Sequence, residues 1–249
     1  MKALITGASS GIGLDMAKLL SKEGHELMLV SRDAQKLSQL AASLPSKCVW
    51  RAADLSIESQ CHYIYEEAKA FGVDTVINNA GFGIHGDFTQ TPLDDELNLI
   101  RLNITAVHIL TKLFVRDFAA AGHGSVLNVA SAAAFLPGPL MSAYYSSKAY
   151  VLRLTLSVRE ELRRSGVNVY IGVLCPGPVN TGFSKRAGVD FAVKALNSSD
   201  VAKYAIRMMR RGKAIIIPGL LMRLAIIGQR LLPTSLLSRI SYNIQKRKA

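Results

Sequence analysis

Short apolar runs rich in valine, isoleucine and leucine alternate along the chain with longer stretches of helical periodicity. The short runs predict strands at residues 2–6, 26–31, 48–52, 74–78, 124–130, 168–174 and 214–217. The stretches between them predict helices near residues 11–23, 33–43, 58–71, 93–120, 143–165 and 199–211. Because strands that are apolar throughout are buried on both faces, this alternation predicts an α/β fold: a doubly wound (Rossmann), seven-stranded parallel sheet with helices on both faces.

No linker rich in Pro, Gly or Ser interrupts the pattern, so we expect a single domain with an extension. Residues 1–213 form the predicted Rossmann-type domain, and residues 214–249 form its last strand and a C-terminal extension. Within the domain, residues 181–198 follow a Pro-Gly turn and place Phe183 and Phe191 among Lys185, Arg186 and Lys194. Their weak periodicity is typical of a mobile lid over a substrate.

Composition agrees with a folded domain and limits its chemistry. Of the 249 residues, 49% are hydrophobic and 19% are charged, which suits one domain with a buried core and excludes a disordered chain. Cys48, Cys61 and Cys175 lie far apart without a C-x-x-C pair, so we expect reduced, half-buried thiols in a cytoplasmic protein and no metal site. The chain reaches Gly7 before any signal-peptide core develops, and we expect no secretory signal.

The net charge of +12 is concentrated at the C-terminal end. Residues 201–249 hold 11 of the 30 Lys and Arg residues and none of the 18 Asp and Glu residues. Such an end usually meets an anionic partner, and its low aromatic content argues against nucleic acid. We expect either an anionic membrane surface, which would place the protein peripherally at the inner membrane, or a second subunit.

The longest uncharged run of the extension has nine residues, too few for a membrane-spanning helix of about 20. Residues 214–249 can instead form a basic amphipathic segment that lies on a surface. Arg223 and Arg230 are seven residues apart and would share one helical face. The apolar side chains that we expect to enter the interface beside them are Leu220, Leu224, Ile227 and Leu231.

A glycine-rich turn, Thr6-Gly7-Ala8-Ser9-Ser10-Gly11-Ile12-Gly13, follows the first predicted strand and opens the first predicted helix. Glycines allow a tight turn, and the free N–H groups and dipole of a helix N-terminus favour an anion. This position after strand one predicts a dinucleotide site, in which the pyrophosphate contacts are Gly7, Ser9, Ser10, Gly11, Ile12 and Gly13.

Ser31 and Arg32 follow the second predicted strand, where dinucleotide folds contact the adenosine ribose. An acid there would bind the 2′-hydroxyl, whereas a hydroxyl and a guanidinium would bind a 2′-phosphate. The pair therefore favours NADP(H) over NAD(H), although Asp33 is placed to reach a ribose hydroxyl. Further cofactor contacts are expected where the third and fourth strands end, at Asp54, Leu55, Asn79, Ala80 and Gly81.

Tyr144 and Lys148 stand four residues apart at the start of a predicted helix, on one face. A nearby ammonium stabilises a phenolate, so we expect Lys148 to bring the pKa of Tyr144 toward neutrality and make it an acid/base. Ser131 ends an apolar strand and would hydrogen-bond the substrate oxygen. Tyr145 is a rival acid/base, but the residue four positions later is alanine.

In these motifs, together with Asn78-Asn79-Ala80-Gly81 and Pro176-Gly177-Pro178-Val179-Asn180-Thr181, the chain resembles the short-chain dehydrogenase/reductase family over residues 1–180. The resemblance implies a catalytic tetrad of Asn103, Ser131, Tyr144 and Lys148. In it, Asn103 would hold a relay water and Lys148 would also bind the nicotinamide ribose. It further implies cofactor contacts at Tyr144, Lys148, Pro176, Gly177, Val179 and Thr181. Contact helices at 93–120 and 143–165 imply a homodimer or homotetramer.

These features together favour an NADP(H)-dependent oxidoreductase that interconverts a carbonyl and a secondary alcohol. The apolar extension favours a lipophilic substrate and a role in lipid metabolism, such as reduction of a 3-oxoacyl thioester. Alternatives are a steroid or small-ketone reductase, or a non-catalytic dinucleotide sensor on the same fold.

Overall fold

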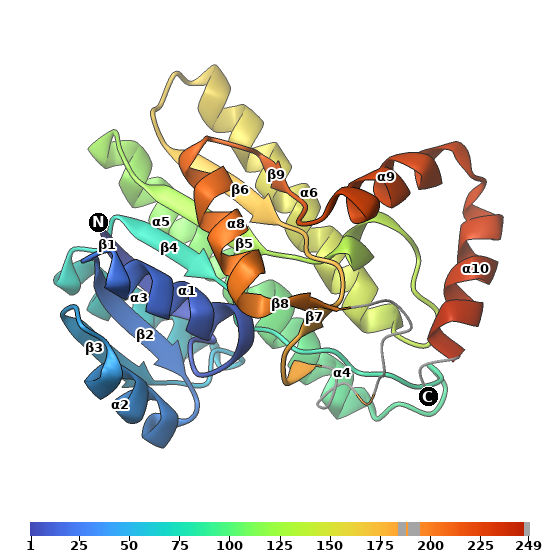
Figure 1. Cartoon of the computed structure of the whole chain (residues 1–249), viewed down its shortest axis with the longest axis horizontal. Coiled ribbons are helices and arrows are strands. Elements are labelled where there is room, and N and C mark those ends of the chain that lie inside the picture. The colour runs from blue at the N-terminus through green and yellow to red at the C-terminus, as the bar shows by residue number, and fades with distance from the viewer. Residues whose placement is uncertain (184–187, 189–194, 247–249) are drawn as a thin grey trace.

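Seven parallel strands form the central sheet in the order β3-β2-β1-β4-β5-β6-β9, which confirms the predicted fold class (Figure 1). The computed structural model describes residues 1–183, 188 and 195–246. The strands are β1 (Lys2–Thr6), β2 (Glu26–Ser31), β3 (Cys48–Ala52), β4 (Thr75–Asn78), β5 (Ser125–Val129), β6 (Tyr170–Leu174) and β9 (Ile215–Ile216). The order reverses between β1 and β4, and a crevice for a ligand opens at such a switch point.

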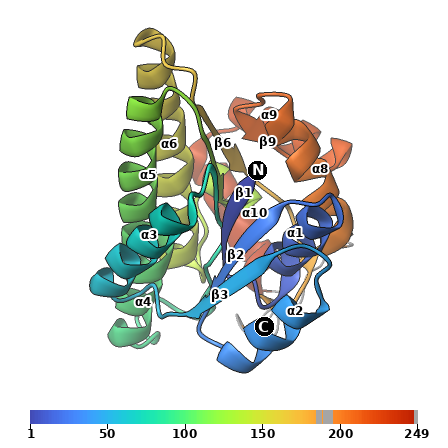
Figure 2. The same cartoon turned by 90° about the vertical axis from the view of Figure 1, so that its left-hand side faces the viewer.

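Helices cover both faces of this sheet (Figure 2). One layer contains α1 (Gly11–Lys22), α2 (Ala34–Ser43) and α8 (Ser198–Arg210). The other contains α3 (Glu58–Phe71), α4 (Leu93–Ile100), α5 (Val107–Ala121) and α6 (Ser142–Arg164). The strand side chains alternate between the two layers, since Ile5 and Leu29 pack toward the first and Leu4 and Met28 toward the second.

A buried polar network joins the sheet to α5 and α6. Asn78 Nδ2 donates to Asn128 Oδ1 at 2.8 Å, and Asn128 Nδ2 donates to Thr155 Oγ1 at 2.9 Å. Thr111 Oγ1 donates to the same Asn128 oxygen at 3.2 Å. Buried polar groups need partners, so this network fixes the position of α6 on the sheet.

The predicted helix 93–120 is interrupted. Between α4 and α5, residues Arg101–Ala106 form a π-helical segment, η1, which hydrophobic spacing does not reveal. By length and composition, the continuous stretch Leu93–Ala121 is the one described helix that could cross a membrane, but 44% of its most apolar window is buried inside the protein. Its buried side chains pack on the sheet as those of a core helix do.

Two short strands, β7 (Val179–Asn180) and β8 (Leu196–Asn197), pair in parallel at the ends of the predicted lid. Most of that lid, including Lys185, Arg186, Phe191 and Lys194, lies outside the described residues. The prediction of a mobile lid at 181–198 therefore stays a prediction.

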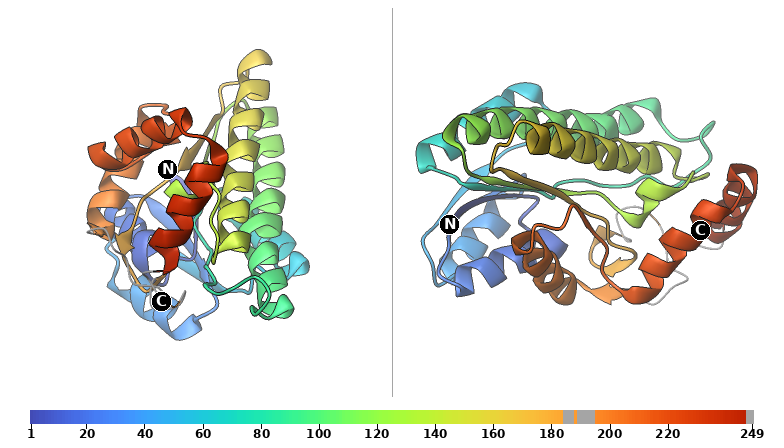
Figure 3. Two further views of the ribbon diagram at one scale, coloured as in Figure 1. Left: turned by 90° about the vertical axis from the view of Figure 1, so that its right-hand side faces the viewer. Right: turned by 90° about the horizontal axis from the view of Figure 1, so that it is seen from above.

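The extension folds into α9 (Leu220–Gly228), the 3-10 turn η3 (Gln229–Leu231) and α10 (Thr234–Lys246). These elements lie beyond the carboxyl ends of the strands (Figures 1 and 3). We expected Arg223 and Arg230 to share one helical face. This prediction was wrong, because α9 ends between them and Arg223 turns inward. Its Nε donates to Ile217 O at 2.8 Å, and its guanidinium lies 5.3 Å from the ring centre of Tyr204 on α8.

Candidate active site

A cavity of about 800 Å³ opens at the carboxyl ends of the central strands, which is a volume suited to a cofactor and part of a substrate. Two predicted site residues, Gly13 and Asn103, do not line it. The predicted residues that do are Gly7, Ser9, Ser10, Gly11, Ile12, Ser31, Arg32, Asp54, Leu55, Asn79, Ala80, Gly81, Ser131, Tyr144, Lys148, Pro176, Gly177, Val179 and Thr181.

The glycine turn leaves room for an anion at the start of α1. Gly7 and Gly11 adopt φ values of +65° and +56°, which favour glycine. A Cβ on Gly13 would lie 2.5 Å from Asn79 Nδ2 and 2.6 Å from Gly7 O, so Gly13 serves close packing. The first turn of α1 holds no acid, and its N-cap Ser10 makes no side-chain capping bond. Free N–H groups without a competing carboxylate suit a pyrophosphate.

Thr6 and Asn79 hold this turn against the end of β4. Thr6 Oγ1 accepts hydrogen bonds from Asn79 N and Ala80 N, both at 3.0 Å. Asn79 Nδ2 donates to Thr6 O at 3.0 Å and to Gly7 O at 3.2 Å. The Asn79 amide thus shapes the turn, and Thr6 is a structural member of the site that sequence reasoning did not single out.

The adenosine end of the cavity carries two cations. Arg32 is 52% exposed, and its guanidinium lies 3.8 Å from Asp54 Oδ2. Asp33 caps α2 by accepting from Lys36 N at 3.0 Å, and it pairs with Lys36 Nζ at 2.9 Å. This contact with Lys36 also lowers the pKa of Asp33. Asp33 is therefore engaged as a helix cap, and Lys36 joins Arg32 in lining the cavity.

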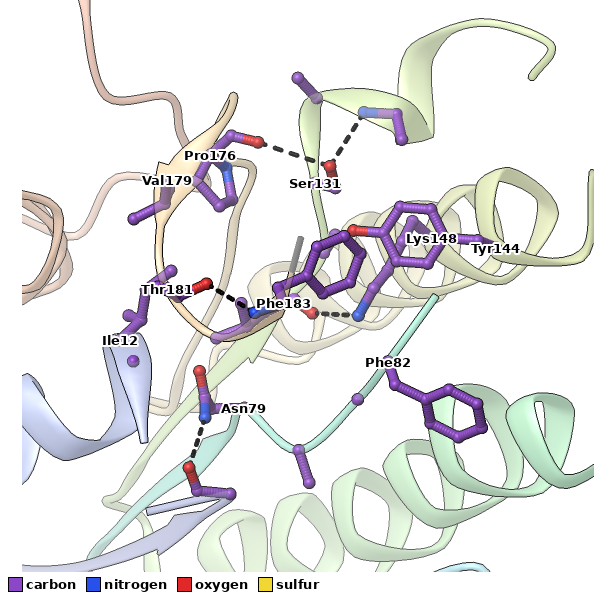
Figure 4. A pocket seen from close by; sticks show the side chains of 18 of the residues that line it. Ile12, Asn79, Phe82, Ser131, Tyr144, Lys148, Pro176, Val179, Thr181 and Phe183 are labelled. Atoms are coloured by element: carbon purple, nitrogen blue, oxygen red, sulfur yellow. Dashed lines mark hydrogen bonds between the residues drawn. The ribbon is translucent and has the colours of Figure 1, made fainter. Parts of the chain in front are cut away.

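The other end of the cavity holds Ser131, which follows β5, and Tyr144 and Lys148, which lie on the first turns of α6 (Figure 4). The Ser131 hydroxyl lowers the pKa of Tyr144, which places the two hydroxyls beside each other. Ser131 Oγ also accepts from Ala133 N at 3.1 Å and donates to Pro176 O at 3.4 Å. Lys148 is 4% exposed, and its Nζ donates to Val129 O at 3.0 Å. The sequence prediction that these three side chains converge agrees with this geometry.

We expected Lys148 to bring the pKa of Tyr144 toward neutrality, and this prediction was wrong. Burial raises the pKa of Tyr144 to about 12, and the nearby Ser131 hydroxyl offsets only part of the rise. Burial also lowers the pKa of Lys148 to about 8. The ammonium lies 5.8 Å from the centre of the Tyr144 ring, and desolvation is the largest cause of the raised pKa of Tyr144. At neutral pH Tyr144 is a neutral phenol, which can donate a proton.

Asn103 lies in the π-helical segment with no exposed surface. Its Oδ1 accepts from Phe82 N at 3.1 Å, and its Nδ2 donates to Phe82 O at 2.9 Å and Ser147 Oγ at 3.1 Å. The Asn103 side chain therefore joins the loop after β4 to α6, the helix that carries Tyr144 and Lys148. Its expected role in holding a relay water stays a prediction.

The remaining wall of the cavity is apolar and comes largely from the predicted lid and from the C-terminal extension, which the sequence predicted to meet a membrane or a second subunit rather than to line the cavity. Phe183 lies 5.2 Å from the Tyr144 ring centre and packs with Met141 and Tyr145. The C-terminal helices add Met222, Ala225, Ile226, Gln229, Leu232, Leu237, Ile240 and Ile244. The spacing of three or four residues within this set could have predicted a helix face that lines the cavity. This signal was missed because the opposite face of α9 is apolar too.

The cysteines do not take part in this chemistry. All three are free, and Cys61 and Cys175 are fully buried rather than half-buried as expected. Burial raises the pKa of Cys175 to about 12, which keeps it a thiol beside the site. Within the described ranges, no group of three or more His, Cys, Asp and Glu residues is arranged to hold a metal ion.

Comparison with known proteins places these motifs in context. A family model described as short chain dehydrogenase matches residues 1–190. An uncharacterized oxidoreductase of Staphylococcus epidermidis is 33% identical over 215 residues, which cover 82% of this chain and 90% of that protein. A very-long-chain 3-oxoacyl-CoA reductase of Pyrenophora tritici-repentis is 34% identical over 193 residues, which cover 74% of this chain and 56% of that protein.

Among solved structures, a short-chain dehydrogenase from Sphingobium yanoikuyae in complex with NADPH is 30% identical, with a TM-score of 0.83. The match covers 92% of this chain and 93% of that one. The glycine turn, the Tyr144–Lys148 pair and the loop from Pro176 to Thr181 all lie within the segment that the family model matches, whereas α9 and α10 lie after it.

Proposed function

The chain belongs to the short-chain dehydrogenase/reductase family and is an oxidoreductase acting on CH–OH groups, and on this premise we propose that it uses NADPH to reduce a lipophilic ketone such as a 3-oxoacyl thioester. One observation carries the proposal: the polar site around Tyr144 continues directly into an apolar cavity wall from α9 and α10.

When bound, NADPH would supply the hydride that forms the new C–H bond. The Tyr144 phenol donates the proton that completes the alcohol, and Ser131 donates a hydrogen bond to the same substrate oxygen as negative charge develops. Lys148, fixed by Val129 O, holds positive charge below the phenol and stabilises its anion after the proton leaves. Asn103 holds the loop at Phe82 next to α6 through its hydrogen bonds to Phe82 and Ser147.

The preference for NADPH is supported by Arg32 and Lys36, two cations that line the adenosine end of the cavity. Asp33 and Asp54 line the same end, but Asp33 is engaged as the cap of α2 and Asp54 lies 3.8 Å from the Arg32 guanidinium. A 2′-phosphate is a dianion that binds best where cations outnumber free carboxylates. The Sphingobium yanoikuyae relative binds NADPH, which agrees with this proposal.

Kinetics with substrates of graded length test the proposed substrate class. The assay follows NADPH oxidation with 3-oxoacyl-CoA substrates of increasing chain length, and with a steroid ketone and a small ketone. Each methylene buried in an apolar cavity contributes about 0.8 kcal/mol, so kcat/KM should rise up to about fourfold per methylene. A flat dependence on chain length would contradict the acyl proposal, and a higher kcat/KM for the steroid would assign the cavity to steroids.

The same assay separates an enzyme from a dinucleotide sensor. A sensor would bind NADPH without turnover of any of these ketones, so cofactor binding by fluorescence is measured alongside. The convergence of Ser131, Tyr144 and Lys148 favours the enzyme, because sensing needs no acid at the nicotinamide end. Binding without turnover across the panel would favour the sensor.

We also propose a cytoplasmic homo-oligomer that assembles through α5 and α6, the contact helices implied by the family. Leu93 and Ile100 on α4 and Tyr150 on α6 are exposed on the same side of the sheet, which supports an apolar contact there. Sedimentation velocity should give a mass of two or four chains at micromolar concentration, and a monomer would contradict this assembly.

A further inference from the structure

The outer face of α9 exposes a row of large apolar side chains. Leu220 is 70% exposed, Leu221 75%, Leu224 57% and Ile227 62%. These positions fall on one side of the helix, and Leu231 in η3 continues the row at 86% exposure. We call these five residues the α9 outer face. They are far more exposed than is usual for leucine and isoleucine in a helix that packs on its own domain.

The opposite side of α9 is apolar as well. Met222 and Ile226 point into the cavity, and Ile226 is only 5% exposed. A helix that is apolar all round is normally covered on every side by protein or by lipid. Since the cavity side is already covered, the α9 outer face requires a partner of its own.

The outer face is continuous with the entrance of the cavity. Leu232, Ile240 and Ile244 line the cavity and yet are 40%, 41% and 42% exposed, which places them at its rim. Ten of the 18 exposed large hydrophobic side chains among the described residues fall between Leu220 and Ile244. The apolar surface thus gathers where a lipophilic substrate would enter.

The charge around this surface selects the partner. No Asp or Glu follows Asp200 in the sequence, whereas Arg239 and Lys246 on α10 are exposed. On the adjoining helix α8, Lys203 and Arg207 are exposed too, as is Arg211 directly after it. Arg207 packs on the Tyr204 ring that Arg223 of α9 also contacts. A two-fold contact with a second copy would set these cations against each other. An anionic lipid surface would complement both the cations and the apolar row.

We propose that the α9 outer face inserts into the headgroup boundary of an anionic bilayer and that the basic residues of α8 and α10 hold the protein there. The helix would lie in the plane of the interface, with the rim of the cavity at the membrane surface. Docking is independent of the proposed function, because it rests on the surface alone. It gives a lipophilic substrate a path from the bilayer that avoids water.

Vesicle flotation of the full chain tests the docking. The wild-type protein should float with vesicles of phosphatidylcholine and phosphatidylglycerol at low ionic strength. It should stay behind with pure phosphatidylcholine, or at about 1 M salt, where the Debye length falls to about 3 Å. Leu224→Ser/Ile227→Ser removes two side chains of the outer face that do not line the cavity, and its affinity for the anionic vesicles should drop at least tenfold.

Ile57→Ser is the matched control, since Ile57 is also exposed, at 47%, but caps α3, where serine is well tolerated. This variant should float like the wild type, and all variants should bind NADPH alike. Absence of flotation of the wild type with anionic vesicles at low salt would overturn the proposal, as would an equal loss in Ile57→Ser. Vesicle-free sedimentation in which only Leu224→Ser/Ile227→Ser dissociates an oligomer would assign the face to a second copy instead.

Discussion

At the scale of single residues, Lys148 holds its charge in the protein interior at a cost to stability. Its usual pKa of 10.5 falls to about 8 on burial, a difference that corresponds to about 3 kcal/mol at neutral pH. Lys148→Met removes this cost but leaves Val129 O without its donor, which offsets about 1 kcal/mol. We expect the variant to be about 2 kcal/mol more stable at pH 7 by urea unfolding, and inactive.

The sign of the pH dependence follows from proton binding. Between pH 8 and 10.5 the unfolded chain holds the Lys148 proton and the folded chain does not, so wild-type stability rises with pH across this window. The advantage of Lys148→Met should therefore be full below about pH 8, vanish at about pH 10 and reverse above it, because the loss of the bond to Val129 O remains. Lys36→Met, at a lysine that is 63% exposed, should show no gain. A variant less stable than wild type at pH 7 would contradict a buried, destabilising charge.

Tyr144→Phe keeps the ring and its packing while it removes the proton that completes the alcohol. We expect kcat to fall by about 10²–10⁴-fold, with NADPH affinity and melting temperature unchanged. Steady-state kinetics and cofactor titration check this. Tyr150→Phe, about two turns further along α6, is the control. The Tyr150 hydroxyl lies 2.7 Å from His108 Nδ1, and Tyr150 does not line the cavity. Wild-type turnover in Tyr144→Phe would assign the acid to another group.

Arg32→Ala tests the proposed contact with the 2′-phosphate. Loss of a charge-assisted contact costs about 1.5–3 kcal/mol, so NADPH should bind about ten- to a hundredfold more weakly while NADH binding stays the same. Lys36→Ala should show a smaller loss of the same kind. Lys47→Ala, at an exposed lysine paired with Glu26, is the control. Equal affinity of the wild-type protein for both cofactors, measured by titration, would refute the NADPH preference.

At the scale of elements, α10 is held to the catalytic helix through polar side chains. Its two buried residues are Ser241 and Gln245, and Gln245 Nε2 donates a hydrogen bond to the Tyr145 hydroxyl. Its apolar residues Ile240 and Ile244 stay about 40% exposed at the cavity rim. This is the reverse of the usual arrangement, in which the apolar side of a helix is buried.

Tyr145→Phe should therefore loosen α10 without touching the chemistry. Loss of one neutral hydrogen bond is worth about 1 kcal/mol, so KM for a long-chain substrate should rise about fivefold with kcat unchanged, and amides of α10 should exchange faster. Ser238→Ala is the control, since that hydroxyl bonds only within α10, to Thr234 O at 2.9 Å. A fall in kcat as large as that of Tyr144→Phe would instead make Tyr145 the acid.

The strands and the glycine turn were predictable from the sequence because their signals are local. Buried parallel strands are continuous apolar runs, and Gly7 and Gly11 sit where positive φ values are needed. The arrangement of α9 was not, because a helix that is apolar on both sides has no dominant periodicity. Arg223 was misplaced for a related reason: its position is set by Tyr204, a partner on another helix.

Some features of the candidate site were likewise predictable from the sequence, and others were not. The convergence of Tyr144, Lys148 and Ser131 follows from helical spacing and strand ends, which a sequence contains. The pKa values of Tyr144 and Lys148 depend on how much protein surrounds them, and that is a property of the packed molecule. Asn103 was found only through family resemblance, because the π-helical turn that holds it leaves no trace in hydrophobic spacing.

At the scale of the whole molecule, the cavity spans the sheet layers and the C-terminal helices, so bound NADPH should stabilise the entire fold. Saturation at 100 times Kd contributes about 2.7 kcal/mol, which raises the melting temperature of a domain of this size by about 5–10 °C. Differential scanning fluorimetry should show a smaller shift with NADH at the same concentration. The difference should disappear in Arg32→Ala, and equal shifts in the wild-type protein would contradict the proposed cofactor preference.

The contact between Met222 and Gly177 has a thermodynamic consequence. A Cβ on Gly177 would lie 2.5 Å from Met222 Cε, so the loop expected under the nicotinamide presses directly on α9. We expect any shift of that loop on cofactor binding to move α9, the helix that we propose to face the bilayer. Linkage is reciprocal, so the factor by which NADPH changes affinity for vesicles must equal the factor by which vesicles change affinity for NADPH. Two independent titrations would then give one coupling constant, and the lipid surface would act as an effector of cofactor binding.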